Sequence, residues 1–82
     1  MPLYYFDVSD DGQSFPDEWG IDLDTIDEAR AQAQALLPHL AREGLPKDDR
    51  RELSVNVRSS EGPCRYRVTL TIQGEWIDPN GA

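Results

Sequence analysis

The stretch LSVNVRSSEGPCRYRVTLTI, residues 53–72, decides the fold, because apolar and polar side chains alternate in two runs that a turn-rich segment separates. The apolar positions are Leu53, Val55 and Val57 in the first run, and Tyr66, Val68, Leu70 and Ile72 in the second. A period of two residues is typical of a strand with one buried face. With SSEGP between them, the two runs predict a hairpin of amphipathic strands.

Residues 3–8 predict a further strand, since they are rich in aromatic and β-branched residues and alternate in the same way. Residues 10–12, Asp-Asp-Gly, then predict a turn, because Asp tolerates left-handed backbone conformations and Gly adopts them without a steric penalty. A short second strand is expected around residues 13–15. Pro16 has no N–H to donate, which confines this strand to a sheet edge.

Thr25 and Glu28 match a capping box, in which the hydroxyl accepts from an early helical N–H and the glutamate reaches back. Apolar side chains then recur every three or four residues, at Ile26, Ala29, Ala33, Leu36, Leu37 and Leu40. This spacing predicts an amphipathic helix that packs one stripe on a sheet. Pro38 is expected to kink or break it, and Gly44 with Pro46 to end it.

The predicted order is strand, short strand, helix, strand, strand, which gives an α+β fold. We expect a two-layer sandwich: an antiparallel sheet of three to four strands with one helix, kinked near Pro38, on one face. The other face stays wet. We expect residues 1–78 to form a single domain in which Trp76 folds back onto the edge, and residues 79–82 to be a frayed tail.

Cysteine use and hydropathy indicate the compartment. The single cysteine, Cys64, cannot form an intrachain disulfide, and the first residues lack the basic-then-apolar pattern of a secretion signal. No run approaches the roughly 18 apolar residues of a membrane span. We therefore expect a soluble cytoplasmic protein.

The net charge of −8 is unevenly distributed. Residues 1–28, here called the acidic lobe, hold nine carboxylates and no Lys or Arg, whereas residues 29–82 hold seven carboxylates and all eight basic groups. Such a field repels phosphate backbones and attracts cations or basic proteins, which argues against a nucleic-acid partner. The excess acid also serves solubility.

Residues 7–18, DVSDDGQSFPDE, come close to the spacing of an EF-hand calcium loop. The candidate ligands are Asp7, Ser9, Asp11, Gln13 and Glu18, with Gly12 at the sixth position. A strand rather than a helix is predicted before this stretch, and Asp and Gly are equally what a hairpin turn requires. We expect a turn and no metal site, and weak calcium binding remains the alternative.

Catalytic candidates are few. His39 is the only histidine, and with Cys64 as its one soft partner it provides too few ligands for zinc. Nucleophilic catalysis would also need an orienting carboxylate close to both. We expect no enzymatic activity and no cofactor.

The wet face of the predicted sheet is the candidate partner-binding surface. Its candidate residues are Tyr5, Asn56, Arg58, Arg65, Arg67 and Thr69. Arginines beside an aromatic ring resemble surfaces that stack single-stranded bases, but the overall charge opposes that use. We expect an unknown protein partner or a homodimer, bound through this face, through the acidic lobe, or by pairing of an exposed strand edge.

The segments LYYFDVSDDG, DEWGIDLDTIDEARAQA and RRELSVNVRSSEGPCRYRVTLTI together resemble a bacterial family of short domains of unknown function. Its members open with Tyr-Phe-Phe-Asp, carry an acidic-Gly turn and an Ala-rich helix, and close with a Ser-Val-x-Val-Arg hairpin. The resemblance spans nearly the whole chain and implies no catalytic residues. Pro38 departs from the uninterrupted helix usual in that family.

Residues 14–37, SFPDEWGIDLDTIDEARAQAQALL, are also similar to HicB-type antitoxins. There, a Phe-Pro-Asp-x-x-Gly strand end leads through Thr-x-x-Glu-Ala into an Ala-rich helix. Those small acidic domains block basic RNA-cleaving toxins, a role compatible with the charge of this chain. Three good strands are expected before the helix in such antitoxins, whereas one strong and one short strand are predicted here. An antitoxin function is the alternative to a general protein-binding role.

Overall fold

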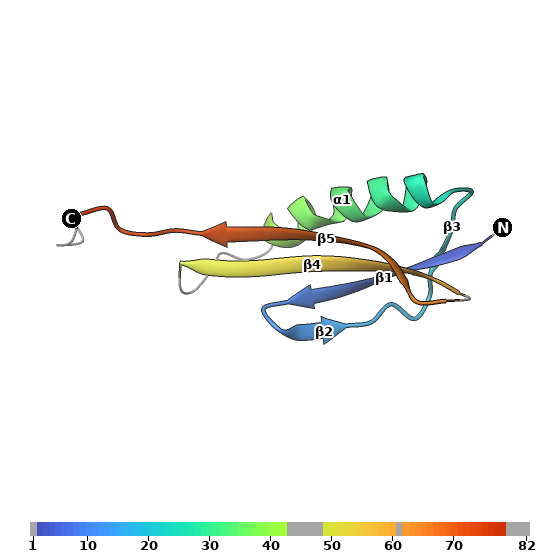
Figure 1. The fold of residues 1–82 in the computed structure, drawn as a ribbon. Helices are drawn as coiled ribbons and strands as arrows, with labels where there is room; N and C mark the ends of the chain where they lie inside the picture. Colours follow the sequence, from blue (N-terminus) through green and yellow to red (C-terminus); the bar gives the residue numbers. More distant parts are fainter. Residues whose placement is uncertain (1, 43–48, 61, 79–82) are drawn as a thin grey trace.

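The computed structural model describes residues 2–42, 49–60 and 62–78 of the 82-residue chain. Its elements are β1 (Leu3–Asp10), β2 (Gln13–Phe15), β3 (Ile21–Asp22), α1 (Ile26–Arg42), β4 (Arg50–Ser59) and β5 (Cys64–Gln73). Figure 1 shows α1 lying on one face of an antiparallel sheet. The predicted α+β fold with one helix is confirmed.

The sheet has five strands, one more than the upper limit predicted from the sequence. The strand order is β2-β1-β4-β5, and β3 also pairs with β1. Both short strands lie on the outer edge of β1, with β2 along its C-terminal part and β3 along its N-terminal part. Pro16 cannot donate to the ladder, so the chain leaves this edge after Phe15 and returns at Ile21.

The β1–β2 hairpin turns at Asp11 and Gly12, as predicted. Asp10 pairs with Gln13, so only the two residues between them form the loop. Their φ angles are 48° and 90°, which is the left-handed backbone of a type I′ turn. The stretch that resembles a calcium loop is thus a tight hairpin.

The start of α1 has the predicted cap with one difference. The N–H of Glu28 donates to Thr25 Oγ1 at 3.2 Å, as a capping box requires. The Glu28 carboxylate accepts from the N–H of Asp24 at 3.0 Å, one residue before the N–H that the motif predicts. Both contacts give an acceptor to a backbone N–H group at the helix N-terminus that has no partner within the helix.

Helix α1 continues through Pro38 to Arg42, so the predicted alternative of a break at Pro38 is wrong. Pro38 is exposed, and water can therefore reach the carbonyl group that loses its helical hydrogen bond. The predicted stop at Gly44 and Pro46 lies outside the described residues.

The core lies between α1 and the three long strands. Its buried residues are Tyr4, Phe6, Ala29, Ala33, Leu37, Leu53, Val55 and Val57. All of them belong to the apolar stripes predicted from the sequence. Because α1 packs on β4 and β5, it leaves the outer part of β1 only partly covered.

The β4–β5 hairpin is longer than predicted, since β4 begins at Arg50, three residues before the first alternating apolar position at Leu53. It also contains a bulge. Val57 pairs with Tyr66, but Arg58 pairs with Cys64, so that Arg65 is an extra residue without a partner in the ladder. Beyond this point the strands pair regularly to the far end of the hairpin.

After β5 the chain continues past the start of β4 in nearly the same direction (Figure 1). Trp76 lies on this segment with 71% of its surface exposed, so the prediction that it folds back onto the domain is wrong. The predicted frayed tail, residues 79–82, lies outside the described residues. Within the described part of the chain, no helix is long and apolar enough to cross a membrane.

Candidate functional site

Polar side chains on the open face of the sheet contact one another in pairs. The guanidinium carbon of Arg58 lies 4.4 Å from the centroid of the Tyr5 ring, and its Nε donates to Asp7 Oδ2 at 2.7 Å. The hydrogen bond to Asp7 is the main cause that raises the pKa of Arg58. Arg67 Nε donates to Asn56 Oδ1 at 2.6 Å. Four of the six predicted partner-binding residues therefore contact one another in two pairs, Tyr5 with Arg58 and Asn56 with Arg67.

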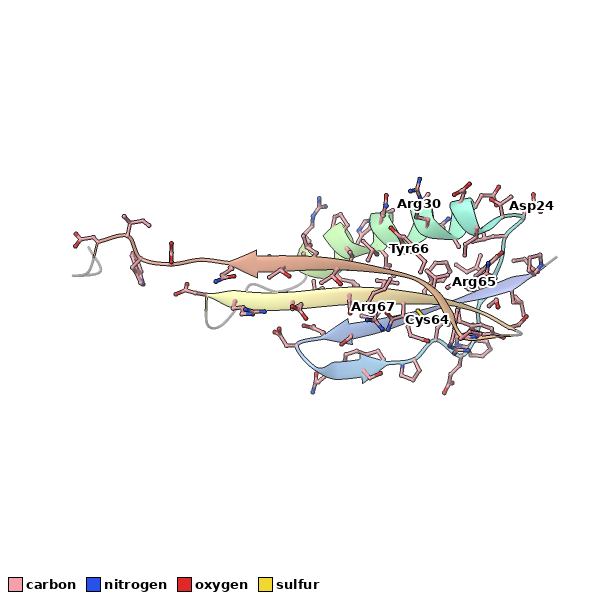
Figure 2. All side chains as sticks on the ribbon, viewed as in Figure 1. Asp24, Arg30, Cys64, Arg65, Tyr66 and Arg67 are labelled. Atoms are coloured by element: carbon pink, nitrogen blue, oxygen red, sulfur yellow. The ribbon has the colours of Figure 1, made fainter. Side chains whose placement is uncertain are left out.

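The other two candidates, Thr69 and Arg65, are placed differently. Thr69 is exposed and lies opposite Ser54, in the same row as Arg67. Arg65 stands in the bulge, where the alternation that placed it beside Arg67 no longer holds. Figure 2 shows Tyr66 directed toward α1 and Arg67 directed away from it. The row of open-face side chains on β5 thus begins at Arg67.

Asp17 fixes the segment between β2 and β3 against the edge of β1. One carboxylate oxygen accepts from the N–H of Phe6 at 3.1 Å, and the other accepts from the N–H groups of Trp19 at 3.0 Å and Gly20 at 3.3 Å. Phe6 lies between the parts of β1 that pair with β2 and β3. A side chain therefore takes the place of a strand at this point of the edge.

The backbone of Asp17 joins this edge to the open-face pairs. Its N–H donates to Asp7 Oδ1 at 2.8 Å, and its carbonyl oxygen accepts from Arg58 Nη2 at 3.1 Å. Partial burial alone would raise the pKa of Asp17. The backbone hydrogen bonds from Trp19, Phe6 and Gly20 and the charge of Arg58 outweigh burial and lower the pKa.

Three large apolar side chains are exposed beside this segment. Phe15 is 53% exposed, Trp19 86% and Ile21 44%. Phe15 pairs with Val8 and Ile21 with Tyr4, both of which pack into the core beneath α1. Directly paired residues point to the same face of a sheet, so Phe15 and Ile21 lie on the α1 side. Both side chains are exposed because α1 does not cover this part of the sheet.

A groove of about 250 Å³ runs between α1 and the outer edge of β1. Its lining residues are Phe6, Asp17, Ile21, Gln32 and Leu36. A neighbouring depression of about 420 Å³ shares Gln32 with it and is lined also by Leu23, Glu28, Ala31 and Ala35. We call this groove, together with Phe15, Trp19 and Ile21, the acidic edge, because its strands and loop belong to the acidic lobe.

A second ion pair ties the acidic lobe to β4. Arg51 binds Asp10 through two hydrogen bonds, at 3.2 Å from Nε and 2.9 Å from Nη2. The hydrogen bond from Arg51 is the main cause that lowers the pKa of Asp10. Both side chains are largely shielded from solvent, with 13% of Arg51 and 32% of Asp10 exposed.

The predicted calcium ligands are occupied by other contacts or point outward. Asp7 binds Arg58, and Asp11 Oδ1 accepts from the N–H of Glu52 at 2.8 Å. Ser9 lies within β1 between two paired strands, while Gln13 and Glu18 are exposed. Across residues 2–42, 49–60 and 62–78, no group of three or more His, Cys, Asp and Glu side chains is placed to hold a metal ion. Weak calcium binding stays the alternative hypothesis.

His39 and Cys64 lie toward opposite ends of the domain. Cys64 is the first residue of β5, toward the end of the sheet at which α1 starts, whereas His39 is in the last turn of α1. About 13 helical residues separate these ends, or roughly 20 Å along the helix axis. The Cys64 sulfur donates to the carbonyl oxygen of Tyr66 at 3.4 Å. The two residues do not form a catalytic pair.

The family model of a domain of unknown function, DUF6894, matches residues 3–71, from the start of β1 into β5. The chain belongs to the DUF6894 family. The predicted membership of a family of short domains of unknown function is thus confirmed. The DUF6894 match includes Asp17 and Arg58 and ends before Trp76. No curated protein and no solved structure matches this DUF6894 chain.

Sequence spacing did not indicate the contacts and exposure of the residues that build the acidic edge. Asp17 stood within the calcium-like stretch and within the Phe-Pro-Asp-x-x-Gly motif, and neither predicted its contacts, although Asp17 followed by Gly20 is the signature of an Asp side chain that caps its own turn. Ile21 gave no strand signal, because only two residues pair there. The exposure of Trp19 depends on how much of the sheet α1 covers, which the sequence pattern does not specify.

Proposed function

We propose that this DUF6894 chain is a non-enzymatic protein-binding domain, and that its acidic edge receives a basic, partly apolar segment of a partner protein. The observation that carries the proposal is the exposure of Phe15, Trp19 and Ile21 beside a groove. Exposed aromatic side chains next to a concave apolar surface are typical of binding sites, and Trp is enriched among residues that dominate binding energy.

The backbone at the acidic edge is held before any partner arrives. Asp17 fixes the N–H groups of Trp19 and Gly20, and Gly20 packs directly on the Tyr5 ring. A surface whose backbone is already fixed loses less conformational entropy on binding. Rigid presentation of Trp19 therefore favours a role in recognition.

Charge specifies the partner's chemistry. Exposed carboxylates surround the acidic edge, at Glu18, Asp22, Asp24, Asp27 and Glu28. Lys and Arg residues flanking an apolar side chain would complement this field and speed association. The expected partner segment inserts an apolar side chain into the groove and places its basic residues over these carboxylates.

Phage display of random peptides of about 12 residues on the immobilised full chain tests this function. We expect enrichment of peptides with Lys or Arg around Leu or Phe, with affinities that fall as salt rises. Counter-selection uses Trp19→Ser with Ile21→Ser, and the matched control is Trp76→Ser. Failure to enrich such peptides, or binding that survives at the doubly substituted acidic edge, would overturn the proposal.

A cytosolic location is supported by the free cysteine. The non-enzymatic part of the proposal is supported by the separation of His39 from Cys64 and by an exposed thiol that donates to the carbonyl oxygen of Tyr66 in its own strand. A thiol of this kind should react with a disulfide reagent at the rate of a free cysteine. Reaction many times faster at neutral pH would contradict it.

An antitoxin function is a second candidate, favoured by β3. With it, three strands precede the helix, one long and two short, where HicB-type antitoxins are expected to have three good strands. The test is co-expression with a short basic protein encoded beside this chain: rescue of growth from its RNA cleavage, and loss of rescue in Trp19→Ser with Ile21→Ser, would support the function. A neighbouring gene of another kind, or no rescue, would remove it.

A further inference from the structure

The two edges of the sheet are treated differently. The β1 edge is covered by β2, β3 and the carboxylate of Asp17. The β5 edge, in contrast, pairs with no strand in the described part of the chain, although β5 is ten residues long. A long unpaired edge is a ready template for pairing with another strand.

The outward backbone groups of β5 follow from one contact. The N–H of Gly74 donates inward to the carbonyl oxygen of Asp49 at 2.6 Å. Because backbone groups alternate sides along a strand, the odd-numbered residues direct their N–H and C=O groups outward. Past the bulge these are Arg67, Thr69, Thr71 and Gln73. Glu75 is the next odd-numbered residue, on the segment that continues the chain after β5 ends at Gln73.

The order of charges along this edge is complementary to the same order in an antiparallel copy of the strand. Arg67 lies near one end and Glu75 near the other, and within the described residues neither takes part in an ion pair. The apolar row toward α1 is only half-buried, at Tyr66, Val68, Leu70 and Ile72, and Trp76 continues its alternation with 71% of its surface exposed. A strand with these features fits an antiparallel copy of itself.

We propose that two copies of the chain pair through β5 in antiparallel register about a two-fold axis at Thr71. This register places Arg67 opposite Glu75 of the second copy, and Tyr66 opposite its Trp76. Leu70 then meets Ile72, and each apolar row covers the other on the α1 side. The outward groups of the five odd-numbered residues form about ten interchain hydrogen bonds in this arrangement.

Sedimentation equilibrium of the full chain over a concentration series tests the dimer. We expect a dimer, and about tenfold weaker dimerisation for either Arg67→Glu or Glu75→Arg. The combined charge exchange should restore wild-type affinity. Arg65→Glu combined with Glu75→Arg is the matched control and should not restore it. A wild-type chain that stays monomeric at about 1 mM, or single exchanges without rescue, would overturn the proposal.

Disulfide crosslinking under mild oxidation tests the register in a Cys64→Ser background. A cysteine at Thr71 faces its own copy across the axis, whereas Thr69→Cys is offset by four residues, roughly 13 Å, and cannot reach. Crosslinking of Thr71→Cys alone supports the proposed axis, and equal crosslinking of both or of Thr69→Cys alone would overturn it. Thr71→Pro removes one outward N–H without touching the β4 ladder, and should give a folded monomer.

Dimerisation through β5 leaves the acidic edge, which lies at the other edge of the sheet, free to bind its own partner. The Thr71→Pro monomer should therefore bind the selected basic peptides as the wild type does. A dimer without peptide binding would contradict only the acidic-edge function, and peptide binding by a monomeric wild type would contradict only the dimer.

Discussion

The guanidinium carbon of Arg58 lies 4.4 Å from the centroid of the Tyr5 ring while the same side chain donates to Asp7 and to the carbonyl oxygen of Asp17. Only a planar guanidinium can stack on a ring and donate in two directions at once. Arg58→Lys should therefore lower the midpoint of urea unfolding although it keeps the charge. Arg65→Lys, in the bulge, is the control and should leave the midpoint unchanged; equal effects would contradict the role of stacking.

Asp17→Ala removes the acceptor for three backbone N–H groups, at Phe6, Trp19 and Gly20. We expect a loss of about 1–3 kcal/mol in the free energy of unfolding, because part-buried donors are left without partners. Urea denaturation followed by circular dichroism measures it. The neighbouring exposed Glu18→Ala should change stability by less than about 0.5 kcal/mol. Similar losses in both variants would show that Asp17 does not hold the edge.

Gly20→Ala and Gly12→Ala separate backbone strain from crowding. Both glycines have positive φ, 75° and 90°, but a Cβ at Gly20 would lie 3.0 Å from Tyr5 Cε1, whereas one at Gly12 has nothing within 4 Å. Gly12→Ala should cost about 1 kcal/mol from conformation alone. Gly20→Ala should cost about 1–2 kcal/mol more, since the ring and Arg58 above it must move. Equal thermal-unfolding losses would contradict the contact.

Acid should weaken the fold through Asp10 and Asp17. Their pKa values in the folded state are lowered from 3.8, so the folded chain binds fewer protons than the unfolded chain. This contribution is fully present above the unfolded pKa, near pH 4, and is lost as the pH falls through the folded values. Urea midpoints at pH 7 and pH 3 measure it. Asp10→Asn with Asp17→Asn should flatten the difference; an unchanged pH dependence would contradict the assignment.

Calcium added to metal-stripped protein should give small, linear backbone amide shifts, spread over the acidic residues. The reason is that Asp7 is engaged by Arg58, and that Asp11, within the type I′ turn, accepts from the N–H of Glu52 on β4. Two-dimensional NMR with magnesium as the control makes the measurement. Saturable shifts centred on Gly12 and reaching Glu18 would instead establish a ligand loop.

The long elements could be predicted because each carries its own periodicity. Residues 53–72 alternate over two full strands. Thr25 and Glu28 predict the start of α1, and the helix of the structure begins directly after Thr25. The buried residues of α1, Ala29, Ala33 and Leu37, follow directly from helical spacing. These features depend on local sequence, and local sequence was enough to predict them.

What depends on long-range contacts could not be predicted. The pairing of Tyr5 with Arg58 needs the register between β1 and β4, which lie far apart in sequence, and the displacement of Arg65 needs a bulge that no residue pattern predicts. The second half of α1 was uncertain because Pro38 disfavours a helix locally, whereas packing of Leu37 on the sheet outweighs it. Asp17 acquired its role only through the gap that Pro16 leaves in the edge ladder.

The carboxylate of Asp17 also limits how this chain can polymerise. A sheet with two free edges can add chain after chain and grow into a filament, whereas here one edge ends in a side chain that already occupies the backbone donor of Phe6. Growth by strand addition can then proceed from one side only, and it stops once that side is filled. Replacing Asp17 would free the N–H of Phe6 between the parts of β1 that β2 and β3 cover, and would weaken this barrier to growth.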